Sequence, residues 1–181
     1  MPVNFFDAHH TRSDQTEFGL YDEPDPAKKP AYILEGDKPK WIGIVKNPNR
    51  FQVDFYGLDH DPATTIYKNP PTNTERESMC DGLVKQQDEL IFVELKTRKG
   101  PGWLADATDQ LINSINLFAR DHVRSIHAFS SVRANICNSL RPNFSQNYMK
   151  EMQRFKDETA GINFKGKRVG LEMTVKQEIE I

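Results

Sequence analysis

The segment 80–99 constrains the fold of this chain more than any other, because it combines two apolar runs with one polar turn. The run from Leu90 to Leu95 is rich in β-branched and aromatic residues and predicts a strand. The shorter apolar run from Cys80 to Val84 predicts a second strand, which pairs with the first across the polar turn at 85–89. The segment is therefore typical of a β-hairpin.

The two faces of the predicted strand at 90–95 differ in polarity. Side chains alternate along a strand, so one face is apolar and is predicted to be core; its members are Ile91, Val93 and Leu95. The other face begins apolar and ends with Glu94 and Lys96. Antiparallel pairing would place Asp81 beside these two residues. The sequence therefore predicts that two acids and a lysine meet at one end of a sheet.

Chain length and cysteine content bound the organisation of the protein. With 181 residues, we expect a polar, extended N-terminal segment at 1–30, which shows no sustained apolar period, and a single domain at 31–181. The two cysteines, Cys80 and Cys137, are too few for a disulfide framework and favour a reducing compartment. Because we find no signal-peptide pattern and no apolar run of membrane-spanning length, we expect a cytoplasmic protein without a membrane partner.

Further elements are predicted from apolar periodicity: helices at 104–121 and 146–158, and strands at 41–45, 51–56, 125–132 and 168–181. The strands at 41–45 and 51–56 flank a turn-forming segment, so we interpret them as a hairpin in a β-rich N-terminal flank. The predicted fold class is α/β. The loop Asp59-His60-Asp61 has residue types found in metal sites, but we interpret it as turn and capping residues because no partner is in view.

Net charge does not by itself indicate a nucleic-acid partner. The formal charge is -2, so any surface that binds a polyanion must be a local patch. The two candidate patches are Lys96, Arg98 and Lys99 after the central strand, and Lys165, Lys167 and Arg168 near the C-terminus. Taken alone, each patch is more typical of a solvated loop or strand edge.

Two carboxylates and a lysine at a sheet end are suited to holding a hard divalent cation against a phosphate. Mg²⁺ and Mn²⁺ take oxygen ligands, so Asp81 and Glu94 are the candidate ligands, and the carbonyl oxygen of Leu95 could add a third. Lys96 would lie beside an attacking water molecule, where a positive charge assists hydrolysis. The chemistry that these residues predict is cleavage of a phosphodiester bond.

The pattern of Asp81, twelve intervening residues, Glu94-Leu95-Lys96 on an apolar strand and a helix that begins near Leu104 resembles the PD-(D/E)XK, or restriction-endonuclease-like, nuclease superfamily. The resemblance implies a mixed β-sheet core flanked by helices, here with a β-rich N-terminal extension. It also implies that Asp81 and Glu94 bind the metal and that Lys96 serves catalysis. Many members of this superfamily reach two strands as dimers, which leaves a homodimer open.

The sequence departs from the pattern of this family in three places. Some exonuclease-like branches carry a glutamine on the following helix and a tyrosine four positions on; Gln110 matches the glutamine, whereas Ser114 stands in place of the tyrosine. Met79-Cys80 stands where the motif has a proline. The family core usually opens with a helix that bears a further glutamate, and no such helix is predicted here. Glu77 is the candidate for this additional ligand, with Glu75 close by.

Three functions from different classes are consistent with these features. The first is a metal-dependent nuclease that acts on DNA rather than RNA, with Arg98 and Lys99 at flanking phosphates. The second is a catalytically inactive binding or scaffold protein that keeps the nuclease fold. The third is a β-rich structural protein of phage or mobile-element origin, and the predicted helix at 104–121 argues against it.

Overall fold

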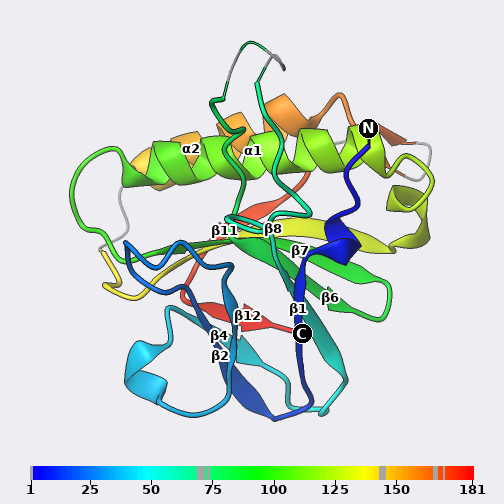
Figure 1. Ribbon diagram of the computed structural model, residues 1–181. Helices are drawn as coiled ribbons and strands as arrows, with labels where there is room; N and C mark the ends of the chain where they lie inside the picture. Colours follow the sequence, from blue (N-terminus) through cyan, green and yellow to red (C-terminus); the bar gives the residue numbers. More distant parts are fainter. Residues whose placement is uncertain (1, 69–71, 73, 143–145, 165–166, 169) are drawn as a thin grey trace.

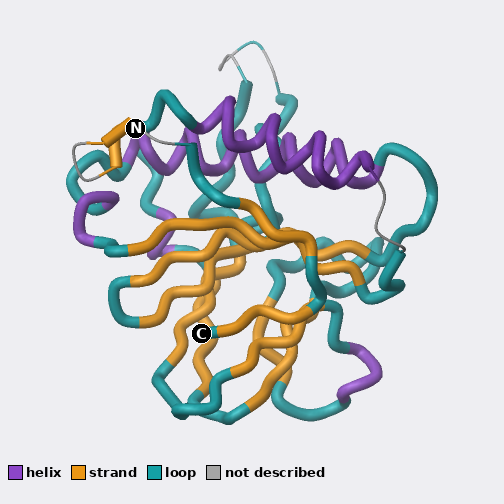
Figure 2. Tube along the Cα trace, turned by 180° about the vertical axis from the view of Figure 1, so that it is seen from behind, coloured by secondary structure: helices purple, strands orange, loops and turns teal. Residues whose placement is uncertain are grey.

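The computed structural model describes the chain except for residues 1, 69–71, 73, 143–145, 165–166 and 169. Within the described part, the protein is mixed α/β and has three layers. Two α-helices cover one face of a six-stranded sheet, and a four-stranded sheet packs against the other face (Figures 1 and 2). The predicted α/β class is therefore confirmed.

The six-stranded sheet is mixed and has the order β1-β5-β6-β7-β8-β11. Its strands are β1 (His9–Ser13), β5 (Val53–Gly57), β6 (Gly82–Gln86), β7 (Glu89–Lys96), β8 (Ser131–Asn138) and β11 (Met173–Val175). Neighbours among β1, β5, β6 and β7 pair antiparallel, whereas β8 lies parallel to both β7 and β11. The parallel strands β7, β8 and β11 therefore have their carboxyl ends on the same side of the sheet.

The remaining elements form the outer layers. The four-stranded sheet has the order β12 (Glu178–Glu180), β4 (Gly43–Lys46), β2 (Glu17–Tyr21) and β3 (Tyr32–Leu34). A small sheet pairs β9 (Asn163–Phe164) with β10 (Lys167–Arg168). The α-helices are α1 (Trp103–Asp121) and α2 (Gln146–Thr159), and short 3₁₀ helices lie at Phe5–Asp7, Lys38–Lys40 and Ile126–Ala128.

The central hairpin is confirmed as β6 and β7. Gly82 lies opposite Val93, and the turn at 87–88 places Gln87 at a φ of 49°. Both faces of β7 are buried: Phe92 packs on α1 at 5.5 Å from the ring of Phe118, while Ile91 belongs to the core between the two sheets. Because β7 is central, neither of its apolar faces meets water.

The two long helices are also confirmed, with boundaries within one residue of the prediction. Helix α1 begins after Gly102, whose φ of 87° suits a residue without a side chain, and buries residues at helical spacing. These include Leu104, Ala107, Leu111, Ile115 and Phe118. The two helices packed on the main sheet show that the described part of the chain is not all-β.

The expectation for residues 1–30 is wrong, because this segment supplies strands to both large sheets. Strand β1 is the edge of the six-stranded sheet, and β2 lies inside the four-stranded sheet. The exposed polar side chains of β1 hide its strand character in the sequence. They are compatible with a sheet edge because Arg12 Nε lies 2.7 Å from Asp54 Oδ1 on the neighbouring strand. Phe18 and Leu20 of β2 are fully buried.

The predicted hairpin of 41–45 and 51–56 is wrong, although both strands exist. Strand β4 pairs with β2 and β12, whereas β5 pairs with β1 and β6 in the other sheet. The Asn47 side chain closes the connecting turn by accepting a hydrogen bond from the Phe51 amide at 2.9 Å. Alternation of apolar residues indicates a strand but does not identify its partner, so the sequence could not separate the two sheets.

Two predicted strands in the C-terminal part are corrected. The segment 125–132 contains a 3₁₀ helix at Ile126–Ala128, and the strand β8 begins at Ser131 and continues to Asn138. The predicted strand at 168–181 contains Arg168 of β10 and all of β11 and β12, which belong to three different sheets. Of the second basic patch, Lys165 lies outside the described residues. Among the described residues, no helix combines the length and apolar character needed to cross a membrane.

Gly19→Ala is expected to lower the free energy of unfolding by roughly 1–3 kcal/mol, as over-packing of a core does. A Cβ atom at Gly19 would lie 2.0 Å from the Trp41 ring, which cannot move freely because its Nε1 donates to the Gly36 carbonyl. Urea denaturation measures the change. Gly36→Ala is the matched control, since its Cβ would meet no atom within 4 Å. Equal stability of both variants would contradict this packing.

Candidate active site

The site begins at the register of the central hairpin. Asp81 immediately precedes β6 and lies across from the end of β7, where Glu94 follows Val93. The Asp81 amide donates a hydrogen bond to Glu94 Oε2 at 3.2 Å, and the Leu95 amide donates to Asp81 Oδ2 at 2.6 Å. The predicted meeting of the two acids is therefore present, and both carboxylates are held by backbone groups of the opposite strand.

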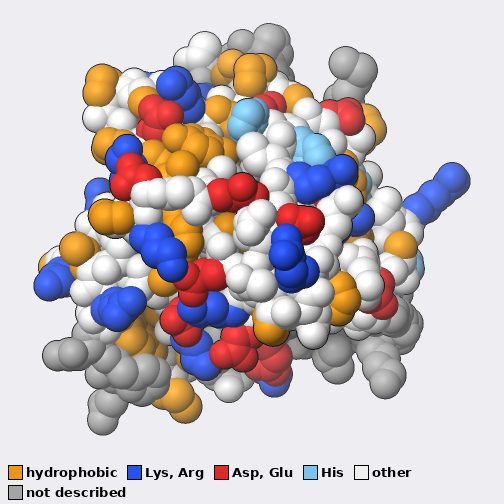
Figure 3. Space-filling model, turned by 90° about the horizontal axis from the view of Figure 1, so that it is seen from below, with side chains coloured by type: hydrophobic (Ala, Val, Ile, Leu, Met, Phe, Trp, Pro, Cys, Tyr) orange, Lys and Arg blue, Asp and Glu red, His pale blue; other side chains and the backbone are white. Residues whose placement is uncertain are grey.

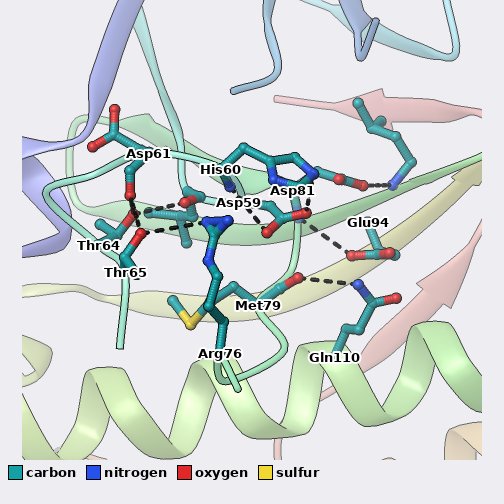
Figure 4. Close-up of polar contacts among 12 residues, drawn as sticks. Asp59, His60, Asp61, Thr64, Thr65, Arg76, Met79, Asp81, Glu94 and Gln110 are labelled. Atoms are coloured by element: carbon teal, nitrogen blue, oxygen red, sulfur yellow. Dashed lines mark hydrogen bonds and ion pairs between the residues drawn. The ribbon is translucent and has the colours of Figure 1, made fainter. Parts of the chain in front are cut away.

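Lys96 is fixed beside the two acids by the carboxylate of Glu94 and by helix α1. Its Nζ lies 2.5 Å from Glu94 Oε1 and donates to Gln110 Oε1 at 2.8 Å. The other end of the Gln110 amide donates to the Met79 carbonyl at 3.1 Å. Figure 4 shows Gln110 reaching from α1 toward Glu94. The four candidate catalytic residues thus form one connected group.

These residues line a cavity of about 480 Å³ at the carboxyl end of β7. Glu94 is 1% exposed and Asp81 is 8% exposed, so their carboxylates lie deep in the cavity. The remaining lining comes from three loops, the end of β7 and α1: Asp22, Glu23, Pro24, Asp25, Lys28, Asp59, His60, Ser78, Leu95, Lys96, Thr97, Arg98, Asp106 and Gln110. Seven of the lining side chains are acidic and three are Lys or Arg. The cavity is therefore rich in acidic groups.

Burial raises the pKa values of both acids. Burial raises the pKa of Glu94 to about 7, although Lys96 acts against this shift. Burial, followed by repulsion from Glu94, raises the pKa of Asp81 well above its usual value. Burial alone would disfavour the ammonium of Lys96, but Glu94 and Asp81 outweigh it and raise its pKa. Lys96 is therefore charged at neutral pH, and the carboxylates lack sufficient positive charge around them.

Three cavity residues were missed as site candidates by the sequence analysis. Asp22 follows β2, and Asp59 and His60 lie at the start of the loop that connects β5 to β6. Burial, followed by repulsion from Asp59, raises the pKa of Asp22 to about 6. Figure 4 shows His60 beside Asp59, and His60 Nε2 lies 3.3 Å from Asp59 Oδ2. Within 59–61, Asp61 acts as the predicted turn and capping residue, because its carboxylate accepts hydrogen bonds from the backbone amides of Ala63 and His9.

Glu77, the fourth candidate metal ligand, does not lie with Asp81, Glu94 and Leu95. It does not line the cavity, and its carboxylate lies 3.4 Å from Asn113 Nδ2, one turn along α1 from Gln110. The backbone of Glu77 is held in this position because its amide donates a hydrogen bond to the Ile66 carbonyl. The upstream loop therefore directs Ser78 rather than Glu77 into the cavity.

The two basic candidates lie at the rim. Arg98 lines the cavity, and Lys99 lines a smaller cavity beside it. Both side chains are exposed. They are therefore accessible to a ligand that approaches Lys96 from solvent.

The donor set fits a hard divalent cation in its chemistry. The cavity offers buried carboxylate oxygens from Asp81 and Glu94, and the backbone of Leu95 lies between Glu94 and Lys96. Burial raises the pKa of both carboxyl groups despite the adjacent ammonium of Lys96, so a bound cation would favour their ionised form. Among the described residues, no group of three or more His, Cys, Asp or Glu side chains is arranged to hold a metal ion. Water and substrate oxygens would have to complete the coordination, as is common for Mg²⁺.

Comparisons with protein-family models, with curated proteins and with solved structures found no match to this chain.

Proposed function

We propose that this chain is a divalent-metal-dependent nuclease that hydrolyses phosphodiester bonds in DNA. The observation that carries the proposal is the convergence of Asp81, Glu94 and Lys96 in one cavity that is open to solvent. Two buried carboxylates and one tethered ammonium, contributed by adjacent strands, are the groups that metal-assisted phosphate hydrolysis requires.

The arrangement of the elements supports a place in the PD-(D/E)XK superfamily. The hairpin β6–β7 lies in a mixed sheet, α1 follows it and packs on the same face as Phe92, and β8 returns parallel to β7. This order is consistent with a restriction-endonuclease-like core. The strands β2, β3 and β4 would then be part of the N-terminal extension.

Asp81, Glu94 and the Leu95 carbonyl would hold Mg²⁺ or Mn²⁺. When bound, such a cation supplies positive charge against the phosphate as negative charge develops on its oxygens. Lys96 places its ammonium where an attacking water molecule can be held and oriented. Gln110 keeps this ammonium in place from α1, while Arg98 and Lys99 bind flanking phosphates.

The outer face of the four-stranded sheet offers no competing site for a polyanion. Figure 3 shows acidic and basic side chains interspersed on the side of the molecule where this sheet lies. Lys38 and Lys46 both pair with Glu17, and Lys40 pairs with Asp37 at 2.6 Å. Because these charges neutralise one another, the described part of this face has no extended basic patch.

A cleavage assay with Mg²⁺ or Mn²⁺, on single- and double-stranded DNA and RNA of the same sequence, tests the proposal. We expect DNA to be cut in the presence of either metal and to stay intact with a chelator. The alternative is a catalytically inactive nuclease-fold binding or scaffold protein. It predicts that all four substrates stay intact, including with Mn²⁺, while some of them are bound.

Gln110→Ala is expected to lower the rate of cleavage about 10-fold, because Lys96 loses the partner that positions its ammonium. The rate constant for a single turnover at saturating metal measures this effect. Asn113→Ala is the matched control: it removes an amide one turn along α1 that bonds only Glu77 and Ser78. The positioning role is contradicted if both variants cleave at the same rate.

A further inference from the structure

A second cavity of about 500 Å³ lies beside the catalytic cavity, at the same edge of the six-stranded sheet. Strands β7 and β8 are parallel, and Asn138 at the end of β8 pairs with Lys96 at the end of β7. The second cavity is built from the ends of β8 and β11 and from the first turns of α1 and α2. Its lining residues include Trp103, Ile136, Arg141, Tyr148, Val175 and Lys176. It is therefore one strand away from the proposed scissile bond.

One wall of the second cavity is apolar and aromatic. The rings of Trp103 and Tyr148 meet edge to face, with centroids 6.1 Å apart and an interplanar angle of 75°. Ile136 and Val175, on adjacent parallel strands, continue this wall. Both rings are 6% exposed, so they are held rigidly by their packing. A wall of this kind suits a flat apolar group.

Apart from the carboxylate of Glu178, the polar side-chain groups that remain available in the described lining of this cavity are hydrogen-bond donors. Among the described residues, the Trp103 indole N–H and the Lys176 ammonium have no hydrogen-bond or ion-pair partner. Arg141 uses only its Nε, which donates to Gln177 Oε1 at 2.5 Å. The acid of the lining, Glu178, lies 3.9 Å from Lys46 Nζ. The cavity therefore favours an acceptor-rich, negatively charged ligand.

A basic path connects the two cavities. A smaller cavity of about 210 Å³ shares Trp103, Pro142 and Tyr148 with the second cavity. Its lining begins at Lys99, directly after Arg98 of the catalytic cavity. Together with the cations of the second cavity, these two side chains place positive charge along the whole path. A polyanion that occupies the catalytic cavity can thus continue along this edge of the sheet.

We propose that the second cavity binds an unpaired nucleotide of a single-stranded nucleic acid. Its base packs against the wall of Trp103 and Tyr148, and its phosphates contact Arg141 and Lys176. A paired and stacked base could not enter the cavity, because its faces are covered by its neighbours. The inference rests on the proposed nuclease function for the position of the scissile bond, and it makes the substrate a single strand or an unpaired end.

Fluorescence of Trp103 reports directly on this cavity. The chain has two tryptophans, so Trp41→Phe leaves Trp103 as the sole indole. We expect a single-stranded DNA of about twelve nucleotides, added with Ca²⁺, to quench this emission, and a blunt duplex of the same sequence to leave it unchanged. Absence of quenching by single strands, or equal quenching by the duplex, overturns the proposal.

Charge-removing variants test the same cavity without a change in its packed wall. Arg141→Gln/Lys176→Gln is expected to weaken binding of the single strand about 10-fold or more. Lys85→Gln/Arg124→Gln removes the same number of charges near the opposite end of the sheet and should bind like the parent protein. Equal weakening in the two double variants contradicts the cavity as the binding site.

These binding measurements do not depend on cleavage. A protein that binds single strands as described but cuts no substrate refutes the proposed nuclease function and leaves the cavity assigned. A protein that cuts DNA but fails both binding tests refutes the cavity and leaves the nuclease function in place.

Discussion

Lys96→Met is expected to reduce the rate of DNA cleavage by at least about 100-fold, which is the usual effect of removing one preorganised charge from an active site. The ammonium of Lys96 lies 2.5 Å from Glu94 Oε1 and 2.8 Å from Gln110 Oε1, so its position is set before any substrate binds. Methionine keeps the unbranched, flexible side chain but carries no charge. Single-turnover cleavage at saturating Mg²⁺ measures the loss.

The control for this variant is Lys85→Met, on the neighbouring strand β6 near the hairpin turn. It removes the same charge from the same sheet, far from the cavity, and should cleave at the rate of the unmodified protein. If Lys96→Met retains more than about a tenth of that rate, Lys96 has no role in the chemistry.

Glu94→Gln is expected to change how the stability of the metal-free protein depends on pH. The pKa of Glu94 is about 7 in the folded protein, above the ordinary value of 4.5. Between these two values the unfolded chain has lost the proton that the folded protein still holds. The free energy of unfolding therefore falls as pH rises from about 4.5 to 7, by on the order of 3 kcal/mol, and stays low above pH 7.

In Glu94→Gln this contribution is absent, because the amide does not titrate. Urea denaturation with a chelator, at several pH values from 5 to 8, measures the difference between the two proteins. The variant should become more stable relative to the parent protein as pH rises. A constant difference across this range would show that Glu94 is not held above its ordinary pKa.

The same variant also tests the response to metal. A cation that binds the folded protein stabilises it by mass action, by about 2.7 kcal/mol at a concentration 100 times the dissociation constant. We expect Mg²⁺ or Mn²⁺ to raise the melting temperature of the parent protein at pH 8 and to have little effect on Glu94→Gln. An equal increase in both proteins would place the cation elsewhere.

The sequence predicts the central hairpin, the two long helices and the meeting of Asp81, Glu94 and Lys96, while Gln110 came from the family resemblance. These features depend on local patterns: alternation over one strand, helical spacing over α1 and the register of a single turn. Each pattern spans enough residues to decide between strand and helix. Gln110 joins Asp81, Glu94 and Lys96 because α1, which follows β7 in the chain, packs directly on the face of β7 that carries Glu94 and Lys96.

The sequence does not predict the contributions of distant segments. Strand β1 carries polar side chains, and β2 is only five residues long, so its alternation of Phe18 and Leu20 covers too few residues to be recognised in the sequence. Asp22, Asp59 and His60 come from loops whose positions depend on which sheet each flanking strand joins. Glu77 was chosen for its nearness in sequence to Asp81, but the turn of the chain before β6 directs its carboxylate to Asn113.

The central claim is that Asp81 and Glu94 together hold a divalent cation beside Lys96. Anomalous diffraction from crystals soaked in Mn²⁺ tests it most directly. The account predicts one strong manganese peak in the cavity, with oxygens of both carboxylates about 2 Å from the ion. A manganese peak at another place in the molecule, with these carboxylates uncoordinated, would contradict it.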